Sequence, residues 1–84
     1  MATLYRPRVI DDLRALAPES RAAAIAAIRV VERDPRPDGV SKREAPSPPF
    51  KPGTLVASIA GFIIRYVVAE AGVEFVRVQI APDV

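Results

Sequence analysis

The sequence has 84 residues, half of them apolar, and its twelve Lys and Arg against ten Asp and Glu give a net charge of +2. This length suits a single domain, Met1–Val84, and no more. The absence of Cys and His excludes disulfides, thiolate metal sites, thiol nucleophiles and the usual general base near neutral pH. We therefore expect no metal and no cofactor. The small net charge alone does not point to nucleic acid.

Neither end of the sequence predicts a targeting or membrane segment. Met1–Arg8 contains no apolar core of a signal peptide. The apolar stretch after Lys51 is interrupted by Gly61, Arg65 and Glu70 and is too short to span a bilayer. We expect a cytoplasmic protein without a membrane partner.

The N-terminal half predicts a short strand followed by two helices. Thr3–Arg6 can form an edge strand that Pro7 closes, since proline cannot donate to a ladder. Arg8–Leu16 and the alanine-rich Glu19–Arg33 have helical periodicity, with a break at Pro18. Short alanine side chains allow the two helices to approach each other closely, so we expect an antiparallel helical hairpin. The predicted apolar stripes are Val9, Leu13 and Leu16, then Ala24, Ile25, Ile28 and Val31.

The segment 35–53 contains six prolines and predicts a long irregular loop. A loop of this length is either a surface connection or a functional segment. It also holds much of the local positive charge. Its cations Lys42, Arg43 and Lys51 are therefore predicted contacts for a phosphate or for a partner protein.

Three segments after Gly53 are rich in β-branched and aromatic residues and predict an antiparallel meander: 54–60, 62–68 and 73–80. Alternation assigns one apolar face to the helices, with Leu55, Ala57, Ile59, Phe62, Ile64, Tyr66, Val68, Val76, Val78 and Ile80. The opposite, mixed face would carry Thr54, Val56, Ser58, Ile63, Arg65, Val67, Phe75, Arg77 and Gln79. The fold class is therefore α+β, in the order β-α-α-β-β-β.

Arg65 and Arg77 on adjacent predicted strands are the candidate catalytic or target-binding residues of the mixed face. Two like charges side by side are unfavourable unless an anion compensates them or water solvates them. An anionic partner is one such compensation. Ordinary exposed strand arginines are the alternative interpretation.

Three stretches of the sequence, taken in order, resemble the RelE/ParE superfamily of bacterial toxins. They are Tyr5–Leu16, where an aromatic strand end leads into a "DL..L" helix, Asp34–Lys42, similar to "DPRP.G..K", and Gly61–Val68, similar to "G.YRI.Y.V". The resemblance covers nearly the whole chain. It implies a toxin of a type II toxin–antitoxin module that a cognate antitoxin neutralises.

Members of this superfamily act either as ribosome-dependent mRNA endonucleases or as inhibitors of DNA gyrase. The nucleases carry cations at positions that match Thr54, Val56 and Ile63 here, and a basic residue and a Tyr near the C-terminus, which Ala81–Val84 does not contain. RNA cleavage needs a base, an acid and cations. We therefore expect a toxin that acts by binding its target, as gyrase inhibitors do. A nuclease with displaced cations, and a non-toxic or decayed member, are the alternatives.

Overall fold

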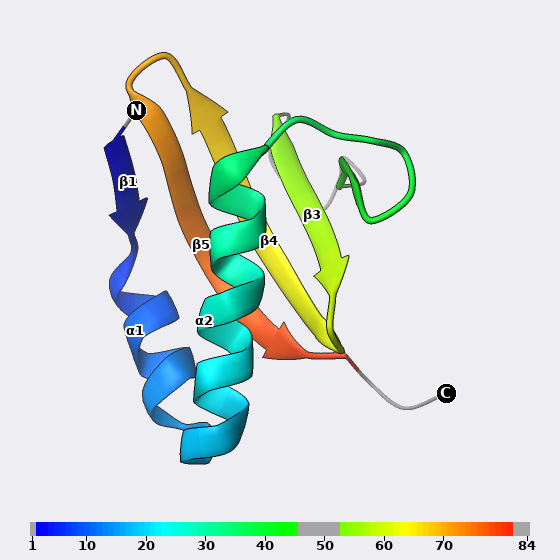
Figure 1. Ribbon diagram of the computed structural model, residues 1–84. Coiled ribbons are helices and arrows are strands. Elements are labelled where there is room, and N and C mark those ends of the chain that lie inside the picture. Colours follow the sequence, from blue (N-terminus) through cyan, green and yellow to red (C-terminus); the bar gives the residue numbers. More distant parts are fainter. Residues whose placement is uncertain (1, 46–52, 82–84) are drawn as a thin grey trace.

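The computed structural model describes residues 2–45 and 53–81, and it has two helices and a five-stranded sheet (Figure 1). The predicted α+β class, with a short strand, two helices and then a meander, is confirmed. Lys51 lies outside the described residues. The elements are β1 (Ala2–Tyr5), α1 (Pro7–Arg14), α2 (Pro18–Arg33), β2 (Lys42–Glu44), β3 (Thr54–Ile59), β4 (Phe62–Ala69) and β5 (Gly72–Ile80).

The strand order is β1-β5-β4-β3-β2, which differs from the sequence prediction in two respects. First, β1 pairs with β5 in parallel, so the first and last strands of the chain are neighbours. Second, β2 forms inside the segment that we expected to be irregular throughout, and it pairs antiparallel with β3. The prolines flank Lys42–Glu44 and do not interrupt it, so these three residues keep the amides that a ladder requires.

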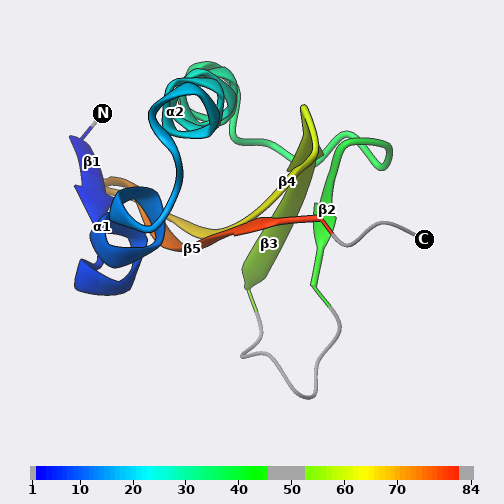
Figure 2. The ribbon, with the colours of Figure 1, turned by 90° about the horizontal axis from the view of Figure 1, so that it is seen from below.

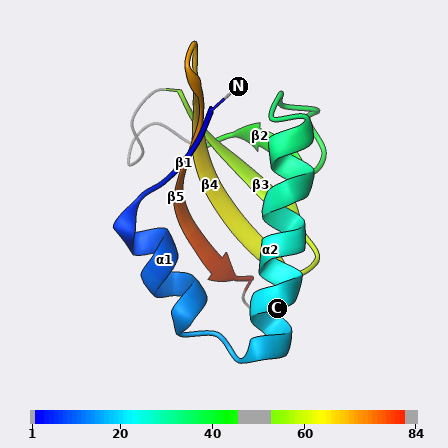
Figure 3. The same ribbon diagram turned by 60° about the vertical axis from the view of Figure 1, so that its left-hand side comes forward.

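The helices begin where proline permits and lie on one side of the sheet or at its border. Pro7 and Pro18 occupy the first turns of α1 and α2, where a missing amide costs nothing. α2 covers one face of the sheet, whereas α1 lies beside the part of β5 that extends beyond β1 (Figures 1 and 2). The two helices run in opposite directions, as the predicted hairpin requires (Figure 3).

The core lies between α2, the first turn of α1 and the helix-facing side of the sheet. Its most deeply buried side chains include Tyr66, Phe75, Ile64, Val9 and Val31. Most of the predicted stripe of α2 is buried. Ile25, which we placed on it, is instead 37% exposed, and Ala27 is buried in the core.

A β-bulge corrects the predicted faces of β5. Arg65 pairs with Arg77, but the next residue of β4, Tyr66, pairs with Phe75, so Val76 is the extra residue. The bulge shifts the alternation and turns Phe75 into the core, where it is fully buried. The prediction that Phe75 lies on the mixed face is therefore wrong.

Candidate functional site

The face of the sheet away from α2 carries a row of residues in register across four strands, which we call the open-face row. Arg43 of β2 pairs with Val56 of β3, Val56 with Arg65 of β4, and Arg65 with Arg77 of β5. Directly opposed residues of antiparallel strands share a face. The structure therefore places Arg43, Arg65 and Arg77 in one row.

Arg77 is bound within the protein by Asp12 of α1. The Arg77 Nε donates to Asp12 Oδ2 at 2.9 Å and its Nη2 donates to Oδ1 at 3.2 Å. The backbone amide of Val78 donates to Oδ2 at 3.0 Å. Burial alone would raise the pKa of Asp12, but these hydrogen bonds and the charges of Arg77 and Arg8 outweigh it and lower that pKa. The anion that compensates the Arg65–Arg77 pair is therefore internal.

Arg65 lies on the open face and is bonded to a neighbouring strand. Its Nη2 donates to the Oε1 atom of Gln79 at 3.0 Å, so the side chain extends along the face beside β5. Arg43 is exposed at the border formed by β2. These two arginines lie in the open-face row on either side of Val56.

Lys42 does not act as a loop cation. Its side chain is 7% exposed, and its ammonium group donates to the carbonyl of Asp34 at the C-terminal end of α2. A cation there satisfies one of the carbonyls that the last helical turn leaves unpaired. Lys42 is therefore a structural residue, and the prediction that it contacts a partner is corrected.

The turn before β2 is closed by Asp38. Its carboxylate accepts hydrogen bonds from the amides of Lys42, Val40 and Ser41 and from the Ser41 hydroxyl, which hold the pKa of Asp38 far below its ordinary value. The amides of Asp38 and Gly39 in turn donate to the Lys42 carbonyl at 2.9 and 3.0 Å. The turn therefore occupies the outer side of β2 at Lys42.

A second candidate surface lies on the helical side, between α1, α2 and the end of β1. This helical groove has a volume of about 260 Å³. It is lined by Tyr5, Ile10, Leu13, Ile25, Ile28, Arg29 and Glu32. Ile10 and Tyr5 are each 43% exposed, so the groove presents apolar surface to solvent.

The polar border of the helical groove is organised around Glu32. Its carboxylate accepts from the Tyr5 hydroxyl at 2.8 Å and from the Thr3 hydroxyl at 3.2 Å. Burial and this hydrogen bond raise the pKa of Tyr5 to about 12. Glu32 is therefore engaged with β1, and Arg29 is the cation that lines the groove.

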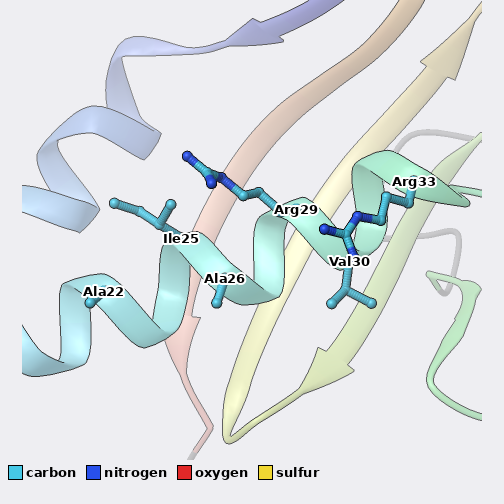
Figure 4. Close-up of a pocket in the computed structure, with 6 residues that line it drawn as sticks. All are labelled: Ala22, Ile25, Ala26, Arg29, Val30 and Arg33. Atoms are coloured by element: carbon cyan, nitrogen blue, oxygen red, sulfur yellow. The ribbon is translucent and has the colours of Figure 1, made fainter.

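The groove continues over the outer side of α2. A shallow depression of about 550 Å³ there is lined by Ala22, Ile25, Ala26, Arg29, Val30 and Arg33. Ile25 and Arg29 point toward α1, and Val30 and Arg33 extend the surface further along the helix (Figure 4). The exposed side of α2 thus combines small or apolar side chains with two arginines one turn apart.

The sequence prediction missed the helical groove because it assigned Leu13, Ile25 and Ile28 to the core and gave Ile10 no role. A signal was present: Ile10 lies outside the Val9, Leu13 and Leu16 stripe, and Ile25 directly follows Ala24. Ile10 therefore extends the apolar surface of its helix beyond the stripe that packs on the sheet. Among the described residues no three His, Cys, Asp or Glu side chains gather as metal ligands, and no helix is long and apolar enough to cross a membrane.

The arrangement of two helices on a five-stranded sheet defines a known class of fold. One chain of the toxin–antitoxin complex RelBE2 from Mycobacterium tuberculosis superposes with a TM-score of 0.75 at 20% sequence identity, over 94% of this chain and 95% of that chain. One chain of the RelB–RelE antitoxin–toxin complex from Methanococcus jannaschii gives 0.63 at 13% identity, over 92% and 88%. No protein-family model and no curated protein matches the sequence.

Proposed function

We propose that this chain is the toxin of a type II toxin–antitoxin module, a cytoplasmic protein that a cognate antitoxin neutralises. The observation that carries the proposal is the fold likeness over nearly the whole chain to chains of two such complexes. The RelE/ParE-like stretches of the sequence support the toxin as the component that this chain represents. The helical groove, apolar and bordered by Arg29, supports a protein partner with an apolar and acidic binding segment.

The toxin acts by binding its target and does not cut RNA. The positions that match the nuclease cations are Thr54, Val56 and Ile63, and none of them carries a charge. Arg77 is held by Asp12 and is three-quarters buried, so it is poorly placed to stabilise a phosphorane-like transition state. Inhibition by binding needs no general base. DNA gyrase is the target class that the sequence resemblance implies for such members.

Arg43 and Arg65 are the target contacts under this proposal. Both belong to the open-face row, on the side of the sheet opposite α2. No described helix covers this side of the sheet (Figure 2), and an acidic surface of a larger protein would complement positively charged residues there.

The test is pulse-labelling of DNA and protein synthesis after this chain alone is induced in a bacterial cell. We expect DNA synthesis to fall first while protein synthesis continues. Arg43→Ala combined with Arg65→Ala should weaken that effect, and Arg8→Ala, which removes an exposed cation outside the row, is the matched control.

Other outcomes would contradict parts of the proposal. A prompt fall in protein synthesis would replace binding of gyrase with ribosome-dependent mRNA cleavage. Continued growth with folded protein accumulating would remove the toxin role and leave a non-toxic family member. Co-expression of the protein encoded beside this chain should restore growth, and its failure to do so would remove that protein as the antitoxin.

A further inference from the structure

The open face carries a second row of paired residues beside the open-face row. Leu4 of β1 pairs with Glu74 of β5, and Glu74 pairs with Val67 of β4. Val67 lies two residues from Arg65 along β4, so their side chains share a face and their Cα atoms are roughly 7 Å apart. The second row therefore runs directly next to the arginines of the open-face row.

The second row contains an apolar hollow of about 160 Å³. Leu4, Val67 and Ala69 form apolar parts of its wall, and residues 71–74 complete it. Leu4 is 59% exposed, so this wall faces solvent. The volume is below the roughly 300 Å³ at which small-molecule sites begin, and it therefore suits a single side chain of a partner.

Glu74 is the charged residue at the border of the hollow, and its carboxylate is paired within the protein. Arg6 Nη2 donates to Glu74 Oε1 at 2.9 Å. This pairing offsets the negative charge at the border, so an incoming acidic residue is repelled less. The positive charge of Arg65, in the neighbouring row, attracts such a residue.

We propose that this hollow is the anchor site for the protein target of the toxin. It takes one aliphatic side chain of the target, and a carboxylate of the same target segment lies over Arg65. Residues two apart on an extended segment, or one turn apart on a helix, have about this spacing. The proposal rests on the proposed function, since it takes the occupant to be the target that Arg43 and Arg65 contact.

A protein fits this surface better than a nucleic acid does. Unpaired bases bind proteins largely by stacking on aromatic side chains. Within residues 2–45 and 53–81, Phe62, Tyr66 and Phe75 are buried in the core, and Tyr5 lines the helical groove. The described part of the open face therefore has no aromatic platform, whereas an apolar hollow beside arginines complements apolar and acidic side chains.

The test compares Ala69→Phe with Val68→Phe. Both residues are exposed and adjacent on β4, but Ala69 lines the hollow, whereas Val68 lies on the opposite face of the sheet. A phenyl ring at position 69 fills the hollow, and the same ring at position 68 leaves it open. Binding to purified DNA gyrase, to purified ribosomes and to the protein encoded beside this chain is measured by biolayer interferometry at two salt concentrations.

We expect gyrase to bind Val68→Phe within about twofold of wild type and Ala69→Phe about tenfold more weakly or worse. Arg65→Ala should also weaken binding, and its binding should depend less on salt, because it lacks a charge that salt screens. Ala69→Phe should keep the salt dependence of wild type, which separates the apolar contact from the ionic one. If Ala69→Phe does not fold, Leu4→Ser, which removes an apolar wall of the hollow from another strand, takes its place.

Equal gyrase binding by Ala69→Phe and wild type would overturn the anchor site and leave the proposed function standing. Weakened binding only to the protein encoded beside this chain would assign the hollow to the antitoxin and would also overturn the inference. Binding of ribosomes in place of gyrase, weakened by Ala69→Phe, would support the anchor site and contradict gyrase as the target. The absence of binding to both gyrase and ribosomes would contradict the inference and the proposed function together.

Discussion

Asp12 contributes to the structure in two ways through a single carboxylate. It pairs with the Arg77 guanidinium, with side chains 15% and 24% exposed, and it caps the Val78 amide of β5. Charge-assisted hydrogen bonds in such partly buried surroundings are stronger than neutral ones. The carboxylate therefore joins α1 to the sheet at a point where β1 no longer covers β5.

Asp12→Asn should lower the free energy of unfolding by about 1–3 kcal/mol, because Arg77 loses the charge that it pairs with. The measurement is urea unfolding. Asp11→Asn, which changes the exposed neighbouring carboxylate, should stay within about 0.5 kcal/mol of wild type. Equal stability of the two variants would show that the pair contributes nothing.

The Asp12 carboxylate also predicts that the free energy of unfolding depends on pH. The pKa of Asp12 is lower in the folded protein than in the unfolded chain, so its contribution is complete above the ordinary value of about 3.9. The contribution disappears as the pH falls through the lowered pKa. Urea unfolding in acid should therefore show a smaller loss of stability for Asp12→Asn than for wild type. An identical acid profile would contradict this assignment.

Tyr66 predicts that the free energy of unfolding falls at alkaline pH. Its hydroxyl donates to the Pro35 carbonyl at 2.8 Å, and burial, with the charges of Asp38 and Asp34, raises the pKa of Tyr66 to about 12. A raised pKa contributes stability that is complete below about pH 10 and is lost as the pH rises toward 12. Tyr66→Phe should cost about 1 kcal/mol at neutral pH and reduce the alkaline loss. The measurement is urea unfolding at neutral and alkaline pH, and a Tyr66→Phe variant with the stability and alkaline loss of wild type would refute the role of the Pro35 bond.

Among the secondary structure elements, α1 depends most on a single side chain. It has eight residues and no side-chain N-cap. At its C-terminal end Arg21 of α2 donates to the carbonyls of Leu13, Leu16 and Arg14 at 2.9, 3.0 and 3.3 Å. These bonds satisfy carbonyls that a helix end otherwise leaves to water.

Arg21→Ala should speed hydrogen exchange in α1 by about tenfold, because α1 then frays from its unsupported end. Exchange in β4, which Arg21 does not contact, should be unchanged. Arg14→Ala removes an exposed arginine from the same helix and serves as the control. Unchanged exchange in α1 would show that packing alone holds the helix.

The helices and strands also show which parts of this fold could be predicted from the sequence. Periodicity is local, and it predicted both helices and the three long strands because each buries its own stripe or face. The bulge in β5 depends on how two strands fit each other, so alternation placed Phe75 on the wrong side. β2 has three residues, too few for any period, and the parallel β1–β5 pair joins segments with most of the chain between them.

The candidate site was predictable to a similar extent. Alternation correctly placed Arg65 on the open face, since β4 is long and regular. It could not show that Asp12, far away in the sequence, holds Arg77, or that Lys42 turns inward to the end of α2. A count of charges does not distinguish a cation that is bonded inside the fold from one that lies on the surface.

For the molecule as a whole, the two candidate surfaces lie on opposite sides of the sheet. The helical groove is lined by residues of α1, α2 and β1, and the open-face row lies on the face of the sheet away from α2. A change in one should therefore leave the other intact. Under the proposed function, toxicity and neutralisation belong to separate sets of residues.

Ile25→Asp should weaken neutralisation by the antitoxin and leave growth inhibition unchanged, because it places a charge in the apolar groove. Ala23→Asp puts the same charge on an exposed position of α2 outside the groove and is the matched control. The measurement is growth with and without the co-expressed antitoxin. Full neutralisation of Ile25→Asp would exclude the groove as the antitoxin site.

The parallel pairing of β1 with β5 also determines when this protein acquires its fold. Tyr5 is paired with Phe75, so β1 has to wait for the synthesis of β5 before its ladder can form. At about 5–20 residues per second, this wait lasts roughly 4–14 seconds. Contacts between such distant parts of a chain also slow folding. A nascent chain of this protein therefore cannot complete its sheet before β5 has been synthesised.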